Sequence, residues 1–347
     1  MSAPARLRHI GRVAITLALS AAGGVVASWI GLPAAWVSGG LLVVAVASLA
    51  GVNTEFPRPL LPPVFLVLGI YAGSGVSRET LHQIETWPAS FALLGISLIG
   101  VIAGATWWLH ARCGWDRSTA LLASFPGALS LVLAVAEDLK ADLKKVAIAQ
   151  SLRLLILAEA IPLVALVAGR PAVSSAAALA PAGPPDLVIL LAAGIVASLV
   201  MERLRFPGGW MLGGLTSAAI LFLGGWVEGG LPGFVVIPCT IAIAAIAGSR
   251  FRPGDLAVLP HIARPALVAF AIAIAISGLA AGAVSFLFGI NFVQTLIAFA
   301  PGALETLIIL ATQMNIDPAY VAAHHVVRLL ALVAAVPLLS RWLRRRP

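Results

Sequence analysis

Runs of apolar residues recur along the whole chain, separated by short polar or basic segments. Each run is about 15–26 residues long, and about 20 apolar residues let an α-helix cross the hydrocarbon core of a bilayer. The runs occupy residues 11–30, 33–51, 60–76, 88–110, 118–136, 143–168, 187–204, 207–226, 234–248, 263–288, 292–314 and 318–343. The pattern predicts an all-α polytopic membrane protein. Residues 170–185, rich in Pro, Ala and Ser, are predicted to form a linker between two sets of runs.

The two sets share one sequence pattern. Identical residues recur at an offset of 174 or 175 positions, and chance rarely aligns Pro, Trp, Gly, Asp and Arg in one register. The most informative pairs are Pro33/Pro207, Trp36/Trp210, Gly39/Gly213, Gly40/Gly214, Pro126/Pro301, Gly127/Gly302, Ala128/Ala303, Asp142/Asp317, Arg153/Arg328 and Pro162/Pro337. We interpret residues 1–169 and 186–347 as two membrane repeats produced by internal duplication.

Composition supports a membrane protein and argues against a nucleic-acid partner. Hydrophobic residues make up 61% of the chain, charged residues 10%, and the mean hydropathy is +1.04, whereas soluble domains carry roughly 25% charged residues. The net charge of +8 comes from Lys and Arg that lie mostly in short loops, where membrane topology explains them better than nucleic acid does. Cys113 and Cys239 are too few for a disulfide framework or a four-ligand zinc site.

The distribution of Lys and Arg predicts the topology, because basic residues favour cytoplasmic loops. If all twelve runs cross the membrane, eleven basic residues face one side and nine the other, which gives no preference. If the runs that contain Pro126-Gly127 and Pro301-Gly302 enter and return, eighteen face the cytoplasm and only Arg78 and Arg170 face outward. We therefore expect ten crossings, both termini in the cytoplasm, and a second repeat that is inverted relative to the first. A different short segment in each repeat is the alternative candidate for the one that does not cross.

The two Pro-Gly pairs predict broken helices. Proline removes a backbone donor and glycine loosens the helix, so both segments leave polar backbone groups unpaired within the membrane. Such groups are tolerated where they are buried in protein or line a cavity, and matched breaks point to a transporter's binding site. The helix N-termini that follow, around residues 128–130 and 303–305, favour an anion. The alternative is that both breaks are packing kinks.

Arg153 and Arg328 lie within apolar runs, each 27 residues after its Pro-Gly proline. An arginine there costs at least about 2.5–3.5 kcal/mol on insertion scales and needs a partner or a wet cavity. One hypothesis is that both bind an anionic substrate. The other is that each is a structural tie to the broken helix, or to Glu305 or Glu159.

Three further residues of the second repeat are candidates for coupling to a proton or cation. Glu305 follows the Pro301-Gly302 break, where its counterpart is Ser130; it carries a coupling ion or only neutralises Arg328. His324 and His325 precede Arg328 by one helical turn, and each is either a proton carrier or a hydrogen-bonded structural residue. The histidines show no metal-ligand spacing, so we expect no metal and no cofactor.

Other recurring residues are predicted to be structural. Asp142 and Asp317 precede the last run of each repeat and are expected to cap its helix. The Gly39-Gly40 and Gly213-Gly214 pairs are expected to let helices pack closely. The sequence contains no Gly-rich phosphate loop, no G-x-S-x-G and no H-E-x-x-H, so we expect no enzyme active site.

The paired Pro-x-x-Trp-x-x-Gly-Gly-Leu and Pro-Gly-Ala-Leu motifs, each followed by an arginine, resemble those of the membrane AbrB family of Gram-negative bacteria. That family is defined by an internally duplicated hydrophobic region, and the resemblance covers nearly the whole chain. It shares only a name with the small DNA-binding AbrB of bacilli. Members are often labelled ammonia monooxygenase or regulator, but a copper monooxygenase needs a histidine cluster that this sequence lacks. The family is also grouped with cation/proton antiporter and anion transporter folds, which implies inverted repeats with broken helices.

From these observations we expect a bacterial inner-membrane transporter that moves a small, anionic solute by alternating access. The expected substrate-binding residues are Pro126, Gly127, Ala128, Ser130, Arg153, Pro301, Gly302, Ala303, Glu305 and Arg328. The expected partners are a small-molecule substrate and the lipid bilayer, and a homodimer remains open. The alternatives are a membrane regulatory or sensory protein that binds a small ligand and, disfavoured, a membrane monooxygenase.

Overall fold

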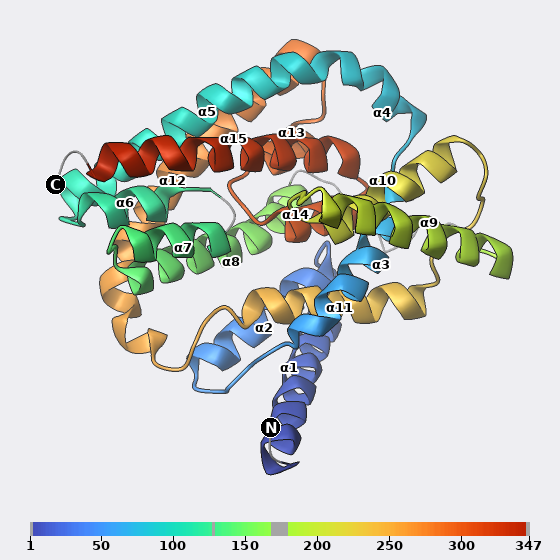
Figure 1. Ribbon diagram of the computed structural model, residues 1–347, viewed down its shortest axis with the longest axis horizontal. Helices are drawn as coiled ribbons and strands as arrows, with labels where there is room; N and C mark the ends of the chain where they lie inside the picture. The colour runs from blue at the N-terminus through green and yellow to red at the C-terminus, as the bar shows by residue number, and fades with distance from the viewer. Residues whose placement is uncertain (1–2, 127–128, 168–179, 345–347) are drawn as a thin grey trace. The chain divides into compact units, whose positions relative to one another are not determined.

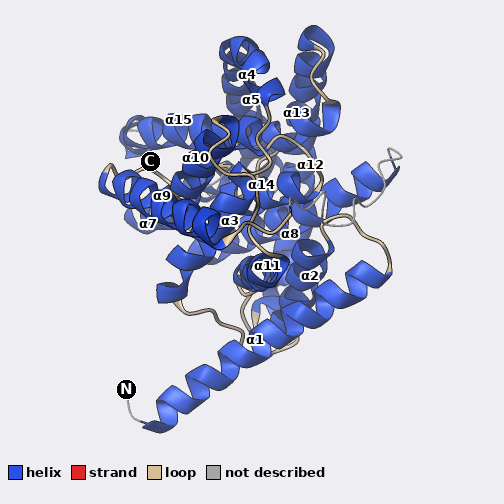
Figure 2. Ribbon diagram, turned by 90° about the vertical axis from the view of Figure 1, so that its right-hand side faces the viewer, coloured by secondary structure: helices blue, strands red, loops and turns tan. Residues whose placement is uncertain are grey.

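The computed structural model describes residues 3–126, 129–167 and 180–344, and the helices dominate all three ranges (Figures 1 and 2). The α-helices are α1 (Ala3–Trp29), α2 (Ala35–Leu49), α3 (Leu61–Gly73), α4 (Arg78–Gln83), α5 (Trp87–Trp107), α6 (Arg117–Ser124), α7 (Leu129–Asp138), α8 (Leu143–Val167), α9 (Pro184–Arg203), α10 (Gly209–Leu223), α11 (Gly233–Gly248), α12 (Asp255–Phe288), α13 (Phe292–Phe299), α14 (Leu304–Gln313) and α15 (Pro318–Arg344). Short helical turns are η1 (Arg58–Leu60), η2 (Ile84–Thr86) and the π-helical η3 (Trp108–Arg112). Within the described ranges, the only extended pairing is one isolated bridge between Pro181 and Gly230.

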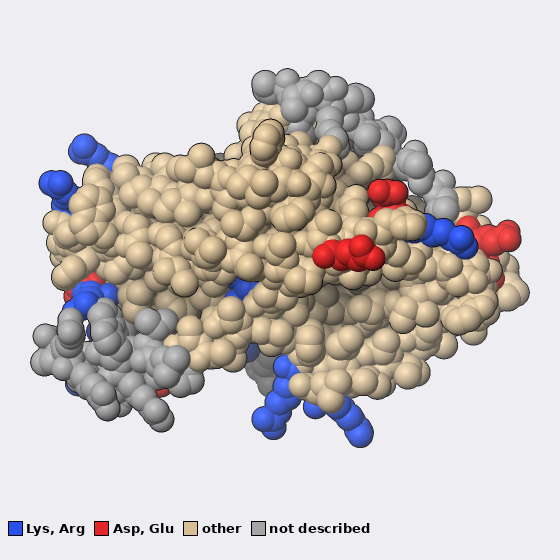
Figure 3. Space-filling model, turned by 90° about the horizontal axis from the view of Figure 1, so that it is seen from above, with Lys and Arg blue, Asp and Glu red and all other residues tan. Residues whose placement is uncertain are grey.

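The helices have the lengths and composition of membrane spans. Among the described residues, six helical segments are long and apolar enough to cross a bilayer, and five shorter helices are also apolar. On the face drawn in Figure 3, Lys, Arg, Asp and Glu side chains are few and most of the visible surface is uncharged. The chain is therefore an all-α polytopic membrane protein, as the apolar runs predict. The predicted linker lies largely outside the described residues, and its last two positions already belong to α9.

Local backbone conformation recurs along the chain with the offset found in the sequence. Helices α2 and α10 start and end 174 residues apart, and α6, α7 and α13, α14 match at an offset of 175. Ten of the eleven described residues with positive φ also form pairs at these offsets. The pairs are Gly31/Arg205, Ala34/Gly208, Gly51/Gly225, Gly114/Gly289 and Lys140/Asn315. Because three of the five pairs join different residue types, shared backbone geometry has persisted where the side chains have changed.

The chain divides into two compact units, and each unit takes helices from both sequence repeats. The first unit comprises Met1–His82, Ala158–Gly254 and Glu305–Tyr320, and the second comprises Gln83–Leu157, Asp255–Leu304 and Val321–Pro347. The first unit thus contains α1–α3, α9–α11 and α14. The second contains α5–α7, α12 and α13, together with most of α8 and α15.

Glycines allow close helix packing in the first unit. A Cβ on Gly39 of α2 would overlap the backbone of Gly23 in α1, and one on Gly213 of α10 would overlap Ser198 in α9. Contacts also join α2 to α11 and α10 to α3, so helices of the two repeats interlock within this unit (Figure 1). These contacts fit the packing role expected of the Gly-Gly pairs.

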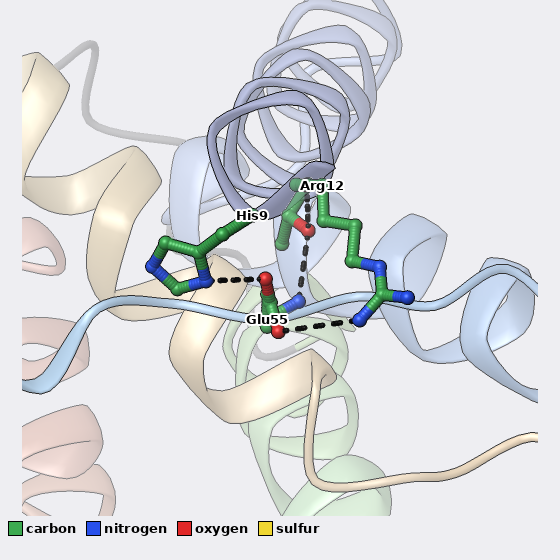
Figure 4. A network of polar contacts seen from close by, with 4 residues as sticks. His9, Arg12 and Glu55 are labelled. Carbon is green, nitrogen blue, oxygen red and sulfur yellow. Dashed lines mark hydrogen bonds and ion pairs between the residues drawn. The ribbon is translucent and has the colours of Figure 1, made fainter. Parts of the chain in front are cut away.

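A polar network fixes the loop that follows α2 against the start of α1 (Figure 4). The carboxylate of Glu55 pairs with His9 at 2.6 Å, and its second oxygen lies 3.9 Å from Arg12. The Glu55 backbone amide donates to the Thr16 hydroxyl, which itself donates to the Arg12 carbonyl. The side chains are partly exposed, so the ion pairs contribute at most about 1 kcal/mol.

The second unit has its own apolar core. Helices α5 and α12 pack along each other, and α6 and α13 pack against them, with buried side chains such as Leu109, Phe125 and Ile262 between the helices. Both Pro-Gly prolines and both buried arginines belong to this unit. The candidate site therefore lies in this unit.

Candidate functional site

Both Pro-Gly segments interrupt their helices. Helix α6 ends at Ser124 and α7 begins at Leu129, while α13 ends at Phe299 and α14 begins at Leu304. The residues that follow α6 and α13, Phe125 and Ala300, have extended backbone conformations with ψ of 123° and 135°. A helix N-terminus consequently begins within three residues of each proline, which is the arrangement the sequence predicts.

Helices α6 and α7 form a hairpin. The amide of Asp142, after the end of α7, donates to the hydroxyl of Thr119 in the first turn of α6 at 2.8 Å. The chain therefore returns after the break to the level at which α6 begins. Helix α8 then runs alongside α6 in the same direction, because Gln150 reaches Leu122 and Arg153 reaches Phe125. This geometry favours a segment that enters the membrane and returns.

Each buried arginine caps the half-helix that precedes a break. Arg153 of α8 donates from Nη2 to the Phe125 carbonyl at 2.9 Å. Arg328 of α15 donates to the Ala300 carbonyl at 2.6 Å and to the Ala298 carbonyl at 2.8 Å. The last carbonyls of a helix have no intrahelical partner, so these bonds satisfy groups that the break exposes. Both arginines thus have the structural contact to the broken helix that formed one of the two sequence hypotheses.

A second side chain reinforces each cap one turn earlier. Gln150 Nε2 donates to the Leu122 carbonyl at 3.1 Å, and at the equivalent position His325 Nε2 lies 3.2 Å from the Ile297 carbonyl. Since a carbonyl can only accept, Nε2 of His325 carries the proton, and its Nδ1 accepts from Arg328 at 3.4 Å. His325 is therefore a hydrogen-bonded, fully buried residue.

His324 lies beside it in a different environment. Its Nε2 is 2.7 Å from the Ser90 hydroxyl, and its ring packs against Phe91 and Phe299 at centroid distances of 4.7 and 5.7 Å. The ring is completely buried between α5, α13 and α15. Such surroundings resemble those of a hydrogen-bonded core histidine, and they also place the imidazole one residue away from the cap formed by His325 and Arg328.

The two breaks meet at one cavity. Pro126, Pro301 and Arg328 all line a cavity of about 10 Å³ within the second unit, together with Ser97 and Ser277. Apolar side chains complete its wall: Leu94, Leu98, Val101 and Phe299. A volume of this size is at the lower limit for one water molecule, so a larger ligand requires these helices to move apart.

Arg153 lines a separate cavity of about 20 Å³. Its wall consists mainly of alanines of α5, α6, α8 and α12, with Ser124 as the other polar residue. The two cavities are thus unequal, and only the cavity of Arg328 borders both prolines.

The second unit buries positive charge without burying negative charge. Arg153 is 8% exposed and Arg328 is 3% exposed, and their charges are close enough to repel each other. The acidic residues of this unit are Glu85, Asp116, Glu137, Asp138, Asp142 and Asp255. Five of them are exposed and Asp255 is half-buried. Two backbone carbonyls and His325 accept hydrogen bonds from Arg328, but they do not neutralise its charge, so the unit favours an anion.

Sequence comparison relates the chain to known proteins. The family model described as "Transition state regulatory protein AbrB" matches residues 1–84 and 36–344, which together span almost the whole chain. The chain belongs to the AbrB family. "Putative regulator AbrB" of Escherichia coli (strain K12) is 28% identical over 321 residues and covers 90% of each chain. "Uncharacterized protein YhjN" of Bacillus subtilis (strain 168) is 26% identical over 360 residues, or 94% of this chain and 92% of the relative. No solved structure matches the chain.

The remaining predicted residues of this AbrB-family protein fall into three groups. Gly127 and Ala128 lie outside the described residues, and Ser130 lies in the first turn of α7. Gly302 is buried and Ala303 half-buried, just before α14. Glu305 lies in the first turn of α14 and belongs to the first unit, where its charge interacts with that of Arg250. The counterparts of this charged pair in the first repeat are Gly75 and Ser130, so both charges are specific to the second repeat.

Six residues of the cavity were not predicted from the sequence: Ser97, Ser277, Phe299, Leu94, Leu98 and Val101. A serine in the middle of an apolar run was the only available indication for the first two. Among the described residues, no three His, Cys, Asp or Glu side chains gather as metal ligands would.

Proposed function

We propose that this AbrB-family protein is a secondary transporter of a small organic anion, and not an enzyme. The observation that carries the proposal is the cavity where Pro126, Pro301 and the buried guanidinium of Arg328 meet. Paired helix breaks at a common cavity are typical of transporter binding sites, and buried positive charge without buried carboxylates in the same unit favours a negatively charged ligand.

The proposed mechanism is alternating access across a bacterial inner membrane. Ten crossings, cytoplasmic termini and a second repeat inverted relative to the first would follow from the distribution of Lys and Arg. The hairpin of α6 and α7 supports this topology, since it lets the segment after Arg112 return to the same side before Lys140.

Coupling to protons or sodium is proposed for Glu305, with His324 and His325 as further candidates. Glu305 is half-buried, and its charge interacts with that of Arg250. The two histidines contact the Arg328 cap directly or through one neighbour, so a proton on either ring would add positive charge beside the anion site.

The test is uptake of labelled small organic anions into proteoliposomes that contain the purified protein. We expect accumulation above that of protein-free vesicles, and loss of this accumulation in Arg328→Met. Arg264→Met provides the control, because Arg264 is an exposed arginine of α12. Failure of every anion to accumulate would reject the proposal. Glu305→Gln tests coupling separately, and an unchanged dependence on the ion gradient would reject that role.

A membrane regulatory or sensory protein is the second candidate, because the Escherichia coli relative and the family model carry regulatory names. Such a protein would bind the anion through the same cavity without moving it across the membrane. Binding to purified protein combined with the absence of uptake would favour this alternative.

A further inference from the structure

The cavity at the two breaks contains two buried hydroxyl groups that the transporter proposal does not use. Ser97 of α5 is 5% exposed and Ser277 of α12 is 2% exposed, and both line the cavity of Arg328. Within the described residues, neither hydroxyl donates to a carbonyl of its own helix. Two serines that do not bond their own helices and that line a cavity are candidates to contact a ligand there.

Other buried hydroxyls on apolar helices behave differently. Ser48, Thr240 and Thr312 each donate to the carbonyl four residues earlier, at 2.8, 3.0 and 2.8 Å. This back-bonding is the usual way in which a membrane helix satisfies serine and threonine. Ser97 and Ser277 instead line the cavity.

The cavity wall therefore presents one guanidinium and two serine hydroxyls, and its other described side chains are apolar. Leu94, Val101 and Phe299 are nearly completely buried and form much of the remaining wall. A ligand with two charges, or with many hydroxyls, would leave polar groups without partners against these side chains. Arg153 lines the other cavity and adds no donor to this wall.

We infer that the ligand of this cavity is a short-chain monocarboxylate, whose carboxylate is oriented by Ser97, Ser277 and Arg328 and whose aliphatic chain packs on Leu94, Val101 and Phe299. This inference rests on the proposed anion transport and specifies its substrate class. The two serines are specificity residues, since hydroxyl donors fix the position of a carboxylate that the guanidinium attracts.

The experiment measures thermal stabilisation of the full-length purified protein by acetate, butyrate, succinate, phosphate and chloride. We expect butyrate to bind tighter than acetate, by roughly fourfold for each added methylene, because each buried CH₂ contributes about 0.8 kcal/mol. Ser97→Ala and Ser277→Ala should each weaken butyrate binding about tenfold or more. Ser48→Ala, the same change at a back-bonded serine of α2, should leave it unchanged.

The outcomes separate this inference from the proposed function. Binding of succinate, phosphate or chloride without butyrate, lost in Arg328→Met, would overturn the monocarboxylate and leave anion transport standing. Butyrate binding that is unaffected in both serine variants would overturn their role. Binding of none of the anions would reject the inference and remove the support for anion transport. If Arg328→Met does not fold, the two serine variants and the Ser48→Ala control still decide the question.

Discussion

Arg328 combines a structural contact with a charge that has no buried counterpart in its unit. Its donors hold two carbonyls at the end of α13, and its guanidinium lines the cavity between the breaks. Lysine would keep the cost of burying the charge but would present a single ammonium in place of the planar fork. The planar shape of the guanidinium therefore decides whether both carbonyls at the end of α13 keep their hydrogen bonds.

We predict that Arg328→Lys lowers the stability of the protein. At least one carbonyl of Ala298 and Ala300 would lose its partner, at a cost of about 1–3 kcal/mol. The change is measured as a lower melting temperature in detergent. Arg264→Lys, on an exposed part of α12, should melt like the wild type, and equal melting of both variants would contradict the capping role.

Asp317 caps α15 through bonds from the amides of Ala319 and Tyr320 to its Oδ1. Burial raises the pKa of this carboxyl above its usual value, and the two backbone bonds oppose the shift. A raised pKa means that ionisation of Asp317 reduces stability at neutral pH, and that stability returns as the pH falls towards the raised value.

Asp317→Asn should consequently be at least as stable as the wild type at pH 8, because asparagine caps equally well without the charge. The difference should shrink as the pH falls towards the raised pKa, where the aspartate of the folded protein gains its proton. Melting curves across this pH range provide the measurement. An asparagine variant that is clearly less stable at pH 8 would show that the charge itself stabilises the cap.

At the scale of helices, the contact between α1 and α2 depends on two glycines. A Cβ on Gly23 would overlap the Gly39 carbonyl of α2, and backbone atoms cannot move aside cheaply. We expect Gly23→Ala to cost about 1–3 kcal/mol and to lower the yield of folded protein. Gly11→Ala is the matched control on the same helix, because nothing lies within 4 Å of its added Cβ. Wild-type stability of Gly23→Ala would contradict the close packing.

The hairpin of α6 and α7 makes a prediction about topology. Arg112 precedes α6 and Lys140 follows α7, and both are exposed. In a background without Cys113 and Cys239, single cysteines at these two positions should react with an impermeant maleimide from the same side of the membrane. A cysteine at Arg78 should react from the opposite side. Labelling of positions 112 and 140 from opposite sides would show that the segment crosses the membrane.

At the scale of the whole molecule, the features that can be predicted from the sequence are those that depend on residues close together in the chain. Each apolar run corresponds to a helix or to a pair of half-helices, because length and hydropathy are local properties. The breaks at Pro126 and Pro301 are also local. The small helix α4 was not predicted, since its six residues carry too little apolar periodicity to stand out from a loop.

The two compact units could not be predicted in the same way. They arise from contacts between distant segments, such as α2 with α11 and α10 with α3, and they cut across the sequence repeats. Of the candidate site, the sequence predicts the residues that belong to the duplicated motifs, namely Pro126, Pro301 and Arg328. Ser97 and Ser277 escaped prediction because the sequence does not tell whether a serine bonds its own helix or faces a cavity.

The central claim is that the cavity between the two breaks is reached alternately from both sides of the membrane. It is tested most directly with a single cysteine at Ser277, in the background without Cys113 and Cys239, and an impermeant thiol reagent applied to oriented membrane vesicles of each polarity. Alternating access predicts labelling from both sides, and protection by a bound anion in both cases. Labelling from one side only, or from neither, would contradict transport through this cavity.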